Sequence, residues 1–282
     1  MANITVAAVQ MDPKIGQVGD NRAIILDLLD KAVGLGAQLI VFPEAALSGY
    51  CLDTLDEARA AAEPVPGPSV QAFAQACRAK GVYAVIGMLE DAGERLYNSA
   101  VLVGPHGLIG CYRKSHLPFL GVDRLADPGD SGLQVYDTEL GRLGLLVCYD
   151  LRFPEAARCL ALNGADIIAL PTNWPEGAES APDFIAPTRA LENRVFVITC
   201  DRCGHERGFD FIGKSVILDP AGGRLAQAGL GEEIITATFD PGLARQKRLV
   251  IRPGEFELDT VGGRRPELYA RLVSGAIDSP RV

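Results

Sequence analysis

The stretch Gly36-Ala-Gln-Leu-Ile-Val-Phe-Pro43 returns in altered form as Gly164-Ala-Asp-Ile-Ile-Ala-Leu-Pro171. Both copies join a Gly-Ala turn to an apolar strand that ends at a proline. Each copy is preceded by an apolar strand and then a helical pattern. The strand lies at 4–11 before the first copy and at 143–147 before the second. Since such β-α-β units build sheets covered by helices, the repetition predicts one α/β domain made of two related halves.

Short apolar or alternating runs bounded by turn residues predict further strands at 82–89, 97–103, 108–113, 133–136, 195–199, 214–219 and 234–239. The helical pattern before the second copy covers 154–162, and further helices are expected at 70–79 and 185–193. From Pro241 the chain is more polar and less periodic. We therefore expect a single domain over 1–282, with a C-terminal tail at about 241–282 that could form a dimer contact.

The composition limits the class of protein. The chain has 282 residues and a formal net charge of −9, from 36 acidic and 27 basic side chains, so its summed field repels nucleic acid and anionic membranes. Neither a run of eighteen apolar residues nor a signal-peptide pattern is present. Seven scattered cysteines, an odd number, argue against a disulfide framework and favour a reducing cytoplasm.

Three short segments place a reactive side chain directly after an apolar strand, where an open α/β sheet presents its site. They are Phe42-Pro-Glu44, Tyr112-Arg-Lys114 and the block that begins at Cys148. Cys148 also precedes a helix, whose N-terminal amides would favour the thiolate. A thiol nucleophile needs a proton acceptor, and the charge that develops on its substrate needs a fixed cation. Glu44, Lys114 and Cys148 can meet these needs together.

In this order the segments resemble the carbon-nitrogen hydrolase family, also called the nitrilase superfamily. The resemblance covers essentially the whole chain and rests on Val6-Ala-Ala-Val-Gln-Met11, Phe42-Pro-Glu44, Tyr112-Arg-Lys114, Pro128-Gly-Asp130, the Cys148 block, Arg189-Ala-Leu-Glu-Asn193 and Arg264-Arg-Pro-Glu-Leu-Tyr269. Tyr149-Asp-Leu-Arg-Phe-Pro154 resembles the amidase-like branches, whereas tryptophan and glutamate commonly follow the cysteine in true nitrilases.

The resemblance implies a four-layer α-β-β-α sandwich that assembles as a homodimer or larger homo-oligomer. It also implies that Glu44, Lys114 and Cys148 form the family's Glu-Lys-Cys triad. Cys148 would attack the substrate while Glu44 accepts the thiol proton, and Lys114 with the backbone N–H of Tyr149 would stabilise the oxyanion. A thioester would then be hydrolysed without a metal or organic cofactor. The implied reaction converts a small carboxamide to a carboxylic acid and ammonia, with nitrile and N-carbamoyl or ureido substrates as alternatives.

One departure from the family pattern concerns a second glutamate that many members carry after the lysine. The corresponding loop contains no glutamate, and Asp123 is the nearest replacement, unless it only pairs with Arg124 or caps a turn. Asn173 and Trp174 follow the second copy of the repeated stretch and can line an acyl pocket, unless the tryptophan only fills the core. Tyr50 is a further candidate for substrate binding.

Three other interpretations stay open. Cys200, Cys203 and His205 suggest a metal site, but no second ligand pair lies at zinc-finger spacing, and we expect no metal. His116 could serve as the base for Cys148 in a papain-type pair. The third interpretation is a catalytically silent binding or scaffold protein with the same fold. In every case we expect a small-molecule ligand and neither nucleic acid nor a membrane as partner.

Overall fold

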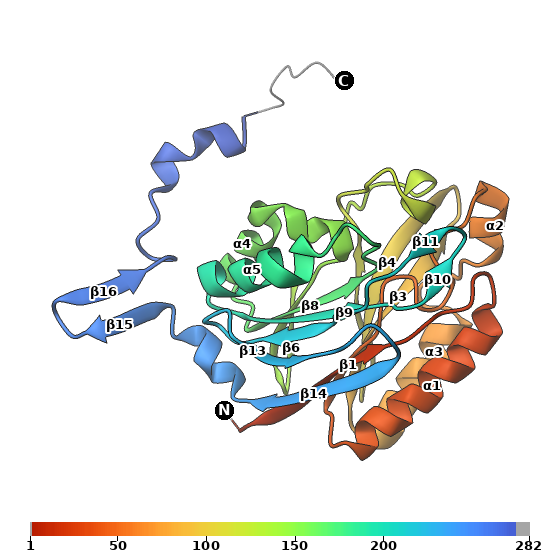
Figure 1. Ribbon diagram of the computed structural model, residues 1–282, viewed down its shortest axis with the longest axis horizontal. Helices are drawn as coiled ribbons and strands as arrows, with labels where there is room; N and C mark the ends of the chain where they lie inside the picture. Colours follow the sequence, from red (N-terminus) through yellow and green to blue (C-terminus); the bar gives the residue numbers. More distant parts are fainter. Residues whose placement is uncertain (1, 275–282) are drawn as a thin grey trace. The chain divides into compact units, whose positions relative to one another are not determined.

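The structure is a computed structural model that describes residues 2–274. Two six-stranded sheets form its centre (Figure 1). In the first sheet the strand order is β14-β1-β2-β3-β4-β5, in which β1, β2 and β3 are parallel and the other neighbours are antiparallel. Its strands are β1 (Ile4–Gln10), β2 (Leu39–Val41), β3 (Tyr83–Ala92), β4 (Arg95–Gly104), β5 (Gly107–Arg113) and β14 (Glu233–Phe239).

The second sheet repeats this plan. Its order is β13-β12-β9-β8-β7-β6, with β7, β8 and β9 parallel and antiparallel neighbours on both sides. Three parallel strands at the centre of each sheet agree with the two related halves expected from the repeated stretch. The strands are β6 (Val135–Thr138), β7 (Gly141–Leu145), β8 (Ile167–Thr172), β9 (Phe196–Asp201), β12 (Val216–Leu218) and β13 (Arg224–Gln227).

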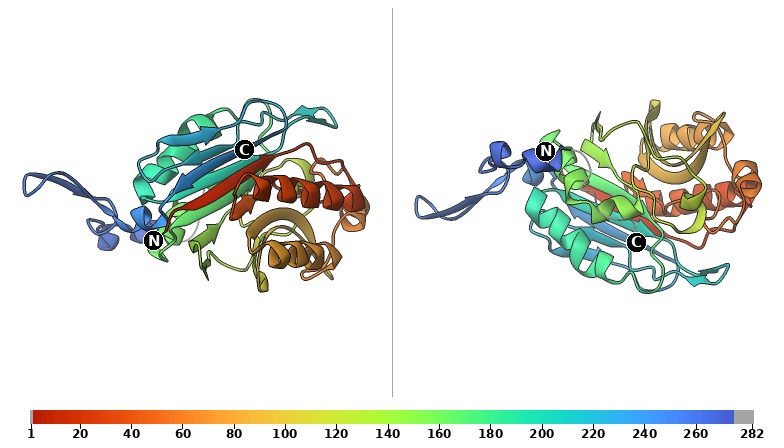
Figure 2. Two further views of the ribbon diagram at one scale, coloured as in Figure 1. Left: turned by 90° about the horizontal axis from the view of Figure 1, so that it is seen from below. Right: turned by 90° about the horizontal axis from the view of Figure 1, so that it is seen from above.

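Helices cover the outer face of each sheet (Figure 2). Alternation along β1 explains the layering, because Val6 and Ala8 pack into the core shared with the second sheet, whereas Ala7 and Val9 pack into the core under the helices of the first. This confirms the predicted four-layer α-β-β-α sandwich. The covering helices are α1 (Val18–Gly34) and α3 (Pro68–Lys80) on the first sheet, and α4 (Pro154–Leu162) and α5 (Ala186–Asn193) on the second.

The remaining elements are short. Helix α2 (Leu55–Ala60) follows β2, and a hairpin of β10 (His205–Glu206) and β11 (Phe209–Asp210) follows β9. The chain divides into two compact units between Arg245 and Gln246. The described part of the second unit contains a hairpin of β15 (Arg248–Arg252) and β16 (Phe256–Asp259) and two 3-10 turns. The interpretation of 1–282 as one domain stays a prediction.

Element boundaries differ from the expected ones for local reasons. Helix α3 begins at Pro68 rather than at residue 70, because proline is favoured in the first helical turn. A π-turn, Ala181–Ile185, leads into α5. Asp20 lies inside the first turn of α1, where its charge complements the helix dipole. Among residues 2–274, no helix is long and apolar enough to cross a membrane.

Candidate active site

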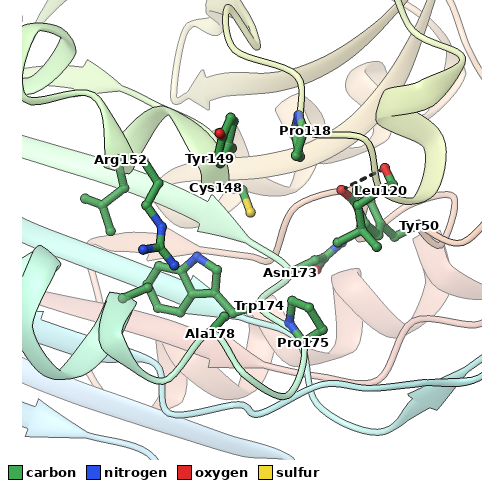
Figure 3. A pocket seen from close by; sticks show the side chains of 12 residues that line it. Tyr50, Pro118, Leu120, Cys148, Tyr149, Arg152, Asn173, Trp174, Pro175 and Ala178 are labelled. Carbon is green, nitrogen blue, oxygen red and sulfur yellow. Dashed lines mark hydrogen bonds between the residues drawn. The ribbon is translucent and has the colours of Figure 1, made fainter. Parts of the chain in front are cut away.

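The candidate side chains follow the ends of strands in both sheets. Glu44 follows β2, Lys114 follows β5, and Cys148 follows β7. The fold brings Glu44 and Lys114 into direct contact and places Cys148 in a pocket with Asn173 and Trp174, which follow β8 (Figure 3). Strands far apart in the sequence therefore build one site.

The backbone is strained at two of these positions. Cys148 begins a 3-10 turn, Cys148–Arg152, with a φ of 46°, in the left-handed region that residues other than glycine rarely adopt. Ala45, next to Glu44, has a φ of 48°. Such conformations persist only where the surrounding structure holds them, and they cluster at functional sites.

Strand β3 approaches the Glu44 turn closely at Gly87. The Gly87 N–H donates to the Pro43 carbonyl at 3.1 Å. A Cβ added to Gly87 would lie 2.3 Å from the Pro43 oxygen and 2.6 Å from Glu44 Cα. Because only glycine fits at these distances, Gly87 permits the turn that presents Glu44.

Lys114 is buried between two carboxylates. Its Nζ lies 2.6 Å from Glu44 Oε1 and 2.5 Å from Asp123 Oδ2. Asn98 on β4 donates to Glu44 Oε1 at 2.7 Å and to Asp123 Oδ1 at 2.9 Å, and the Tyr50 hydroxyl donates to Asp123 Oδ2 at 2.7 Å. We call Glu44, Lys114 and Asp123 the lysine cluster. Sequence analysis missed Asn98, since an asparagine within a strand gives no sign of what it faces.

Burial and neighbouring charges set the protonation states of the lysine cluster. Burial favours the neutral amine, but the Asp123 and Glu44 carboxylates outweigh it and raise the pKa of Lys114 well above its usual value. Burial raises the pKa of Glu44 to about 7, against the opposing charge of Lys114 and with a contribution from Asp123. Lys114 is therefore cationic near neutral pH, where Glu44 exchanges a proton. Glu44 Oε2 has no hydrogen-bond partner among the described residues.

Cys148 carries a protonated thiol at rest. Burial and the Glu44 carboxylate raise the pKa of Cys148 well above its usual value, although Lys114 acts in the opposite direction. The expected stabilisation of the thiolate by helix amides is wrong, because α4 begins only at Pro154 and burial dominates at the sulfur. A neutral thiol needs a base before it can attack.

A pocket of about 320 Å³ opens beside Cys148 (Figure 3). Both polar atoms of the Asn173 side chain are buried without a partner in the described part of the chain, so this amide is available to a ligand. Glu44, Lys114 and Asp123 lie outside this lining, and the Asp123 oxygens accept hydrogen bonds from Lys114, Asn98 and Tyr50. The predicted residues that line the pocket are Tyr50, Tyr149, Asn173 and Trp174.

A second buried charged group supports Tyr50. Glu206 Oε1 accepts hydrogen bonds from the backbone N–H groups of Tyr50, at 2.8 Å, and Cys51, at 2.6 Å. Arg202 Nη1 lies 2.7 Å from Glu206 Oε2, in an ion pair too bent for a hydrogen bond, and Nη2 donates to Asp12 at 2.6 Å. We call Asp12, Arg202 and Glu206 the arginine cluster. Sequence analysis assigned it no role, and its only signal was charge directly after a buried strand.

The other chemical candidates have structural partners. His116 Nδ1 lies 2.7 Å from Asp150 Oδ1, and its ring stacks on Phe153 with a centroid distance of 3.7 Å. His205 contacts Asp210 at 2.8 Å. Within residues 2–274, no group of three or more His, Cys, Asp or Glu side chains is arranged to hold a metal ion. All seven cysteines, which lie in this range, are free thiols.

The chain belongs to the carbon-nitrogen hydrolase family, whose sequence pattern matches residues 5–249. A protein from Pyrococcus abyssi called nitrilase is 43% identical over 248 residues, covering 87% of this chain and 93% of the relative. An (R)-stereoselective amidase from Pseudomonas sp is 36% identical over 229 residues, covering 79% of this chain and 80% of the relative. The chain is therefore an enzyme of carbon-nitrogen bond hydrolysis.

Solved structures support the same conclusion. A nitrilase-superfamily amidase from Nesterenkonia AN1 superimposes with a TM-score of 0.79 at 26% identity, covering 95% of this chain and 97% of that chain. Another structure of that amidase, with a TM-score of 0.78, shows the acetamide moiety of fluoroacetamide added covalently at the active site cysteine. These findings confirm the fold and the amidase-like family expected from the sequence.

Proposed function

We propose that the protein is a cofactor-independent amidase that hydrolyses a small carboxamide to a carboxylic acid and ammonia through a thioester on Cys148. The observation that carries the proposal is the buried Glu44 carboxyl group, which has a pKa of about 7 and an oxygen without a hydrogen-bond partner. Glu44 and the cationic Lys114 both act electrostatically on the protonated thiol of Cys148. The amidase names of a relative and of a structural neighbour support the amide as substrate.

In the first half of the reaction, Cys148 Sγ attacks the amide carbon while Glu44 Oε2 takes up the thiol proton. A carbon-sulfur bond forms, and the carbonyl electron pair moves to the oxygen, where Lys114 and the Tyr149 N–H stabilise it. Glu44 then donates its proton to the amide nitrogen, the carbon-nitrogen bond breaks, and ammonia leaves. The acyl group remains on the sulfur.

In the second half, Glu44 takes a proton from a water molecule whose oxygen attacks the thioester. The carbon-sulfur bond breaks, the proton returns to the sulfur, and the carboxylic acid leaves. A pKa of about 7 suits a group that must both accept and donate a proton near neutral pH. We assign Asp123 a positioning role, since its oxygens are taken up by Lys114, at 2.5 Å, and by the Asn98 and Tyr50 side chains.

A nitrile is the second candidate substrate, because the Pyrococcus abyssi relative is named nitrilase. Attack by Cys148 on a nitrile carbon gives a thioimidate, which water converts first to the thioester with loss of ammonia and then to the acid. An N-carbamoyl or ureido substrate would use the same residues and leave a carbamoyl group on the sulfur.

Ammonia release from matched carboxamides, nitriles and ureas distinguishes these substrates. We expect turnover of butyramide to exceed that of butyronitrile and of urea. Intact mass measured with a slow substrate should show one acyl adduct, absent in Cys148→Ala and retained in Cys159→Ala, which removes an exposed thiol. Folded protein that neither releases ammonia nor forms an adduct would instead be a binding or scaffold protein.

We also propose that the enzyme acts as a homodimer in the cytoplasm, where a reducing environment would preserve its seven free thiols. Size-exclusion chromatography with light scattering tests the assembly. A mass of one chain at micromolar concentration would contradict the dimer.

A further inference from the structure

A buried carboxyl group that the proposed reaction does not use lies at the end of β9. Asp201 is the last residue of this strand and is fully buried. It pairs in register with Thr172, at the end of the neighbouring parallel strand β8. The pocket residues Asn173 and Trp174 follow Thr172 directly, and we call residues 172–174 the wall segment. Asp201 therefore lies next to the segment that forms one side of the pocket.

The Asp201 side chain holds the backbone of the wall segment. Its Oδ1 accepts the Trp174 N–H at 2.8 Å, and the Trp174 carbonyl accepts the Ile212 N–H at 3.0 Å. By contrast, both polar atoms of the Asn173 side chain lack a hydrogen-bond partner within residues 2–274. The position of the Asn173 amide in the pocket therefore depends on the backbone to which it is attached.

Asp201 is itself anchored in the interior. Its N–H donates to Ser215 Oγ at 2.8 Å, and Ser215 Oγ donates to Gln10 Oε1 at 2.9 Å. Gln10 belongs to β1 of the first sheet, and its Nε2 donates to the Gly229 carbonyl at 2.9 Å. Asp201 thus connects the wall segment to both central sheets. Support of this kind keeps a binding group in its productive geometry.

The wall segment also reaches the nucleophile. Burial raises the pKa of the Cys148 thiol, while the Thr172 side chain and the Asn173 backbone act to lower it. Figure 3 shows the Cys148 sulfur pointing towards Asn173 and Trp174. A shift of the wall segment would therefore change both the shape of the pocket and the surroundings of the sulfur.

The surroundings of Asp201 favour an uncharged carboxyl group. Burial, together with the Glu44 charge, raises the pKa of Asp201 well above its usual value, against the opposing effects of the Trp174 N–H and the Arg202 charge. Asp201 Oδ2 has no hydrogen-bond partner among the described residues, and a bare buried oxygen costs less in a neutral acid than in a carboxylate. An amide of the same shape can therefore take the place of this carboxyl group.

We propose that Asp201 is a positioning residue of the amidase reaction, which fixes Asn173 and Trp174 against Cys148 through the Trp174 N–H. The inference rests on the proposed function, because the substrate would bind in this pocket before Cys148 attacks it. Asp201 acts through the wall segment, as Asp123 acts through Lys114. The property that matters is the acceptor oxygen of Asp201 and not a charge.

The test compares Asp201→Leu, which removes the acceptor at similar volume, with Asp201→Asn, which keeps it. In Asp201→Leu the Trp174 N–H loses its partner, and we expect kcat/KM for butyramide to fall about 10- to 100-fold, as for a displacement of about 1 Å. The larger part of this loss should be a rise in KM, since Asn173 and Trp174 line the pocket. Asp201→Asn should keep nearly the wild-type KM.

Asp166→Leu is the matched control. Asp166 is also buried and also accepts a backbone N–H, that of Arg142 at 3.1 Å, but it directly precedes β8, at the end of the strand opposite Thr172. Asp166→Leu should therefore lower stability and leave the KM for butyramide unchanged.

The fluorescence of Trp174 reports on the wall segment independently of activity. Trp174 is the only tryptophan in the chain and is 5% exposed. We expect Asp201→Leu to emit at longer wavelength and to be quenched more strongly by iodide. Asp201→Asn and Asp166→Leu should keep the wild-type emission and quenching, because a general loss of stability does not act on Trp174 in particular.

Three results would overturn the proposal: wild-type emission and KM in Asp201→Leu, an equal impairment of Asp201→Asn, or the same changes in Asp166→Leu. Far-UV circular dichroism establishes that each variant is folded. If Asp201→Leu does not fold, Asp201→Ala takes its place, since it removes the acceptor without adding bulk.

Failure of the amidase function itself would appear differently, as no ammonia release from any amide by wild type. In that case, calorimetry compares the binding of butyramide to Cys148→Ala and to Cys148→Ala/Asp201→Leu. Weaker binding to the double variant, together with its shifted Trp174 emission, supports the positioning role. Equal binding to the two proteins, or binding to neither, rejects it.

Discussion

Two clusters in this protein each combine one buried cation with two carboxylates, and they differ in how those carboxylates are satisfied. In the arginine cluster, Glu206 Oε1 accepts two backbone N–H groups, and Oε2 lies against Arg202. In the lysine cluster, Glu44 Oε1 binds Lys114 and Asn98, but Oε2 has no hydrogen-bond partner among residues 2–274. A carboxylate whose oxygens are both engaged holds structure in place, whereas one with a free oxygen can move a proton.

The clusters also differ in their access to water. All three side chains of the lysine cluster are fully buried, whereas the Asp12 side chain of the arginine cluster is 45% exposed. Burial is the main cause of the raised pKa of Glu44. The lysine cluster is therefore suited to proton transfer, whereas the arginine cluster supports the loop that carries Tyr50.

Glu44→Gln gives the largest expected effect. The amide cannot accept the thiol proton, so kcat should fall about 10³-fold or more, within the range of general-base catalysis. Ammonia release measures the loss, and Glu94→Gln, at an exposed position, should retain activity. If Glu44→Gln kept a tenth of the wild-type rate, the free oxygen would not be the base.

Gly87→Ala tests whether the position of Glu44 matters as much as its charge. The added Cβ would overlap the Pro43 and Glu44 backbone, and a displacement of about 1 Å should lower kcat about 10²-fold. Gly34→Ala, whose Cβ meets nothing within 4 Å, is the matched control and should be active. Activity assays with far-UV circular dichroism separate misplacement from unfolding.

The pH profile tests the charge balance of the lysine cluster. Below a pH of about 7 Glu44 becomes protonated and cannot act as a base, so kcat/KM should fall about tenfold per pH unit on the acidic side. Asp123→Asn removes a negative charge that raises the pKa of Glu44, so the acidic limb should move to lower pH. If the acidic limb did not move in Asp123→Asn, the charge of Asp123 would not act on the pKa of Glu44.

Glu206→Gln should have the smallest effect on catalysis. The amide oxygen can still accept the Tyr50 and Cys51 N–H groups, but Arg202 loses a buried counter-charge, so we expect a stability loss of about 1–3 kcal/mol and a several-fold decrease in kcat. Denaturant unfolding and kinetics measure the two effects. A loss of activity as large as that of Glu44→Gln, without a loss of stability, would remove the distinction between the clusters.

Much of the site was predictable because the reactive residues follow strands whose apolar pattern is local. Glu44, Lys114 and Cys148 were selected in this way, and the structure brings them to one site, while their catalytic roles stay predictions. The prediction that Cys148 is a thiolate was wrong. It considered only the neighbouring helix, whereas burial and the Glu44 charge raise the pKa of the thiol.

The sequence by itself determined the two β-α-β units, the layers they imply and the family, since periodicity, turn residues and ordered motifs are all properties of neighbouring residues. Only the tertiary structure decided which polar groups meet. Asn98 comes from β4 and Glu206 from β10, and neither motif nor spacing links them to Glu44 or Tyr50. Protonation states depend on such distant contacts and on burial, so they arise only in the folded protein.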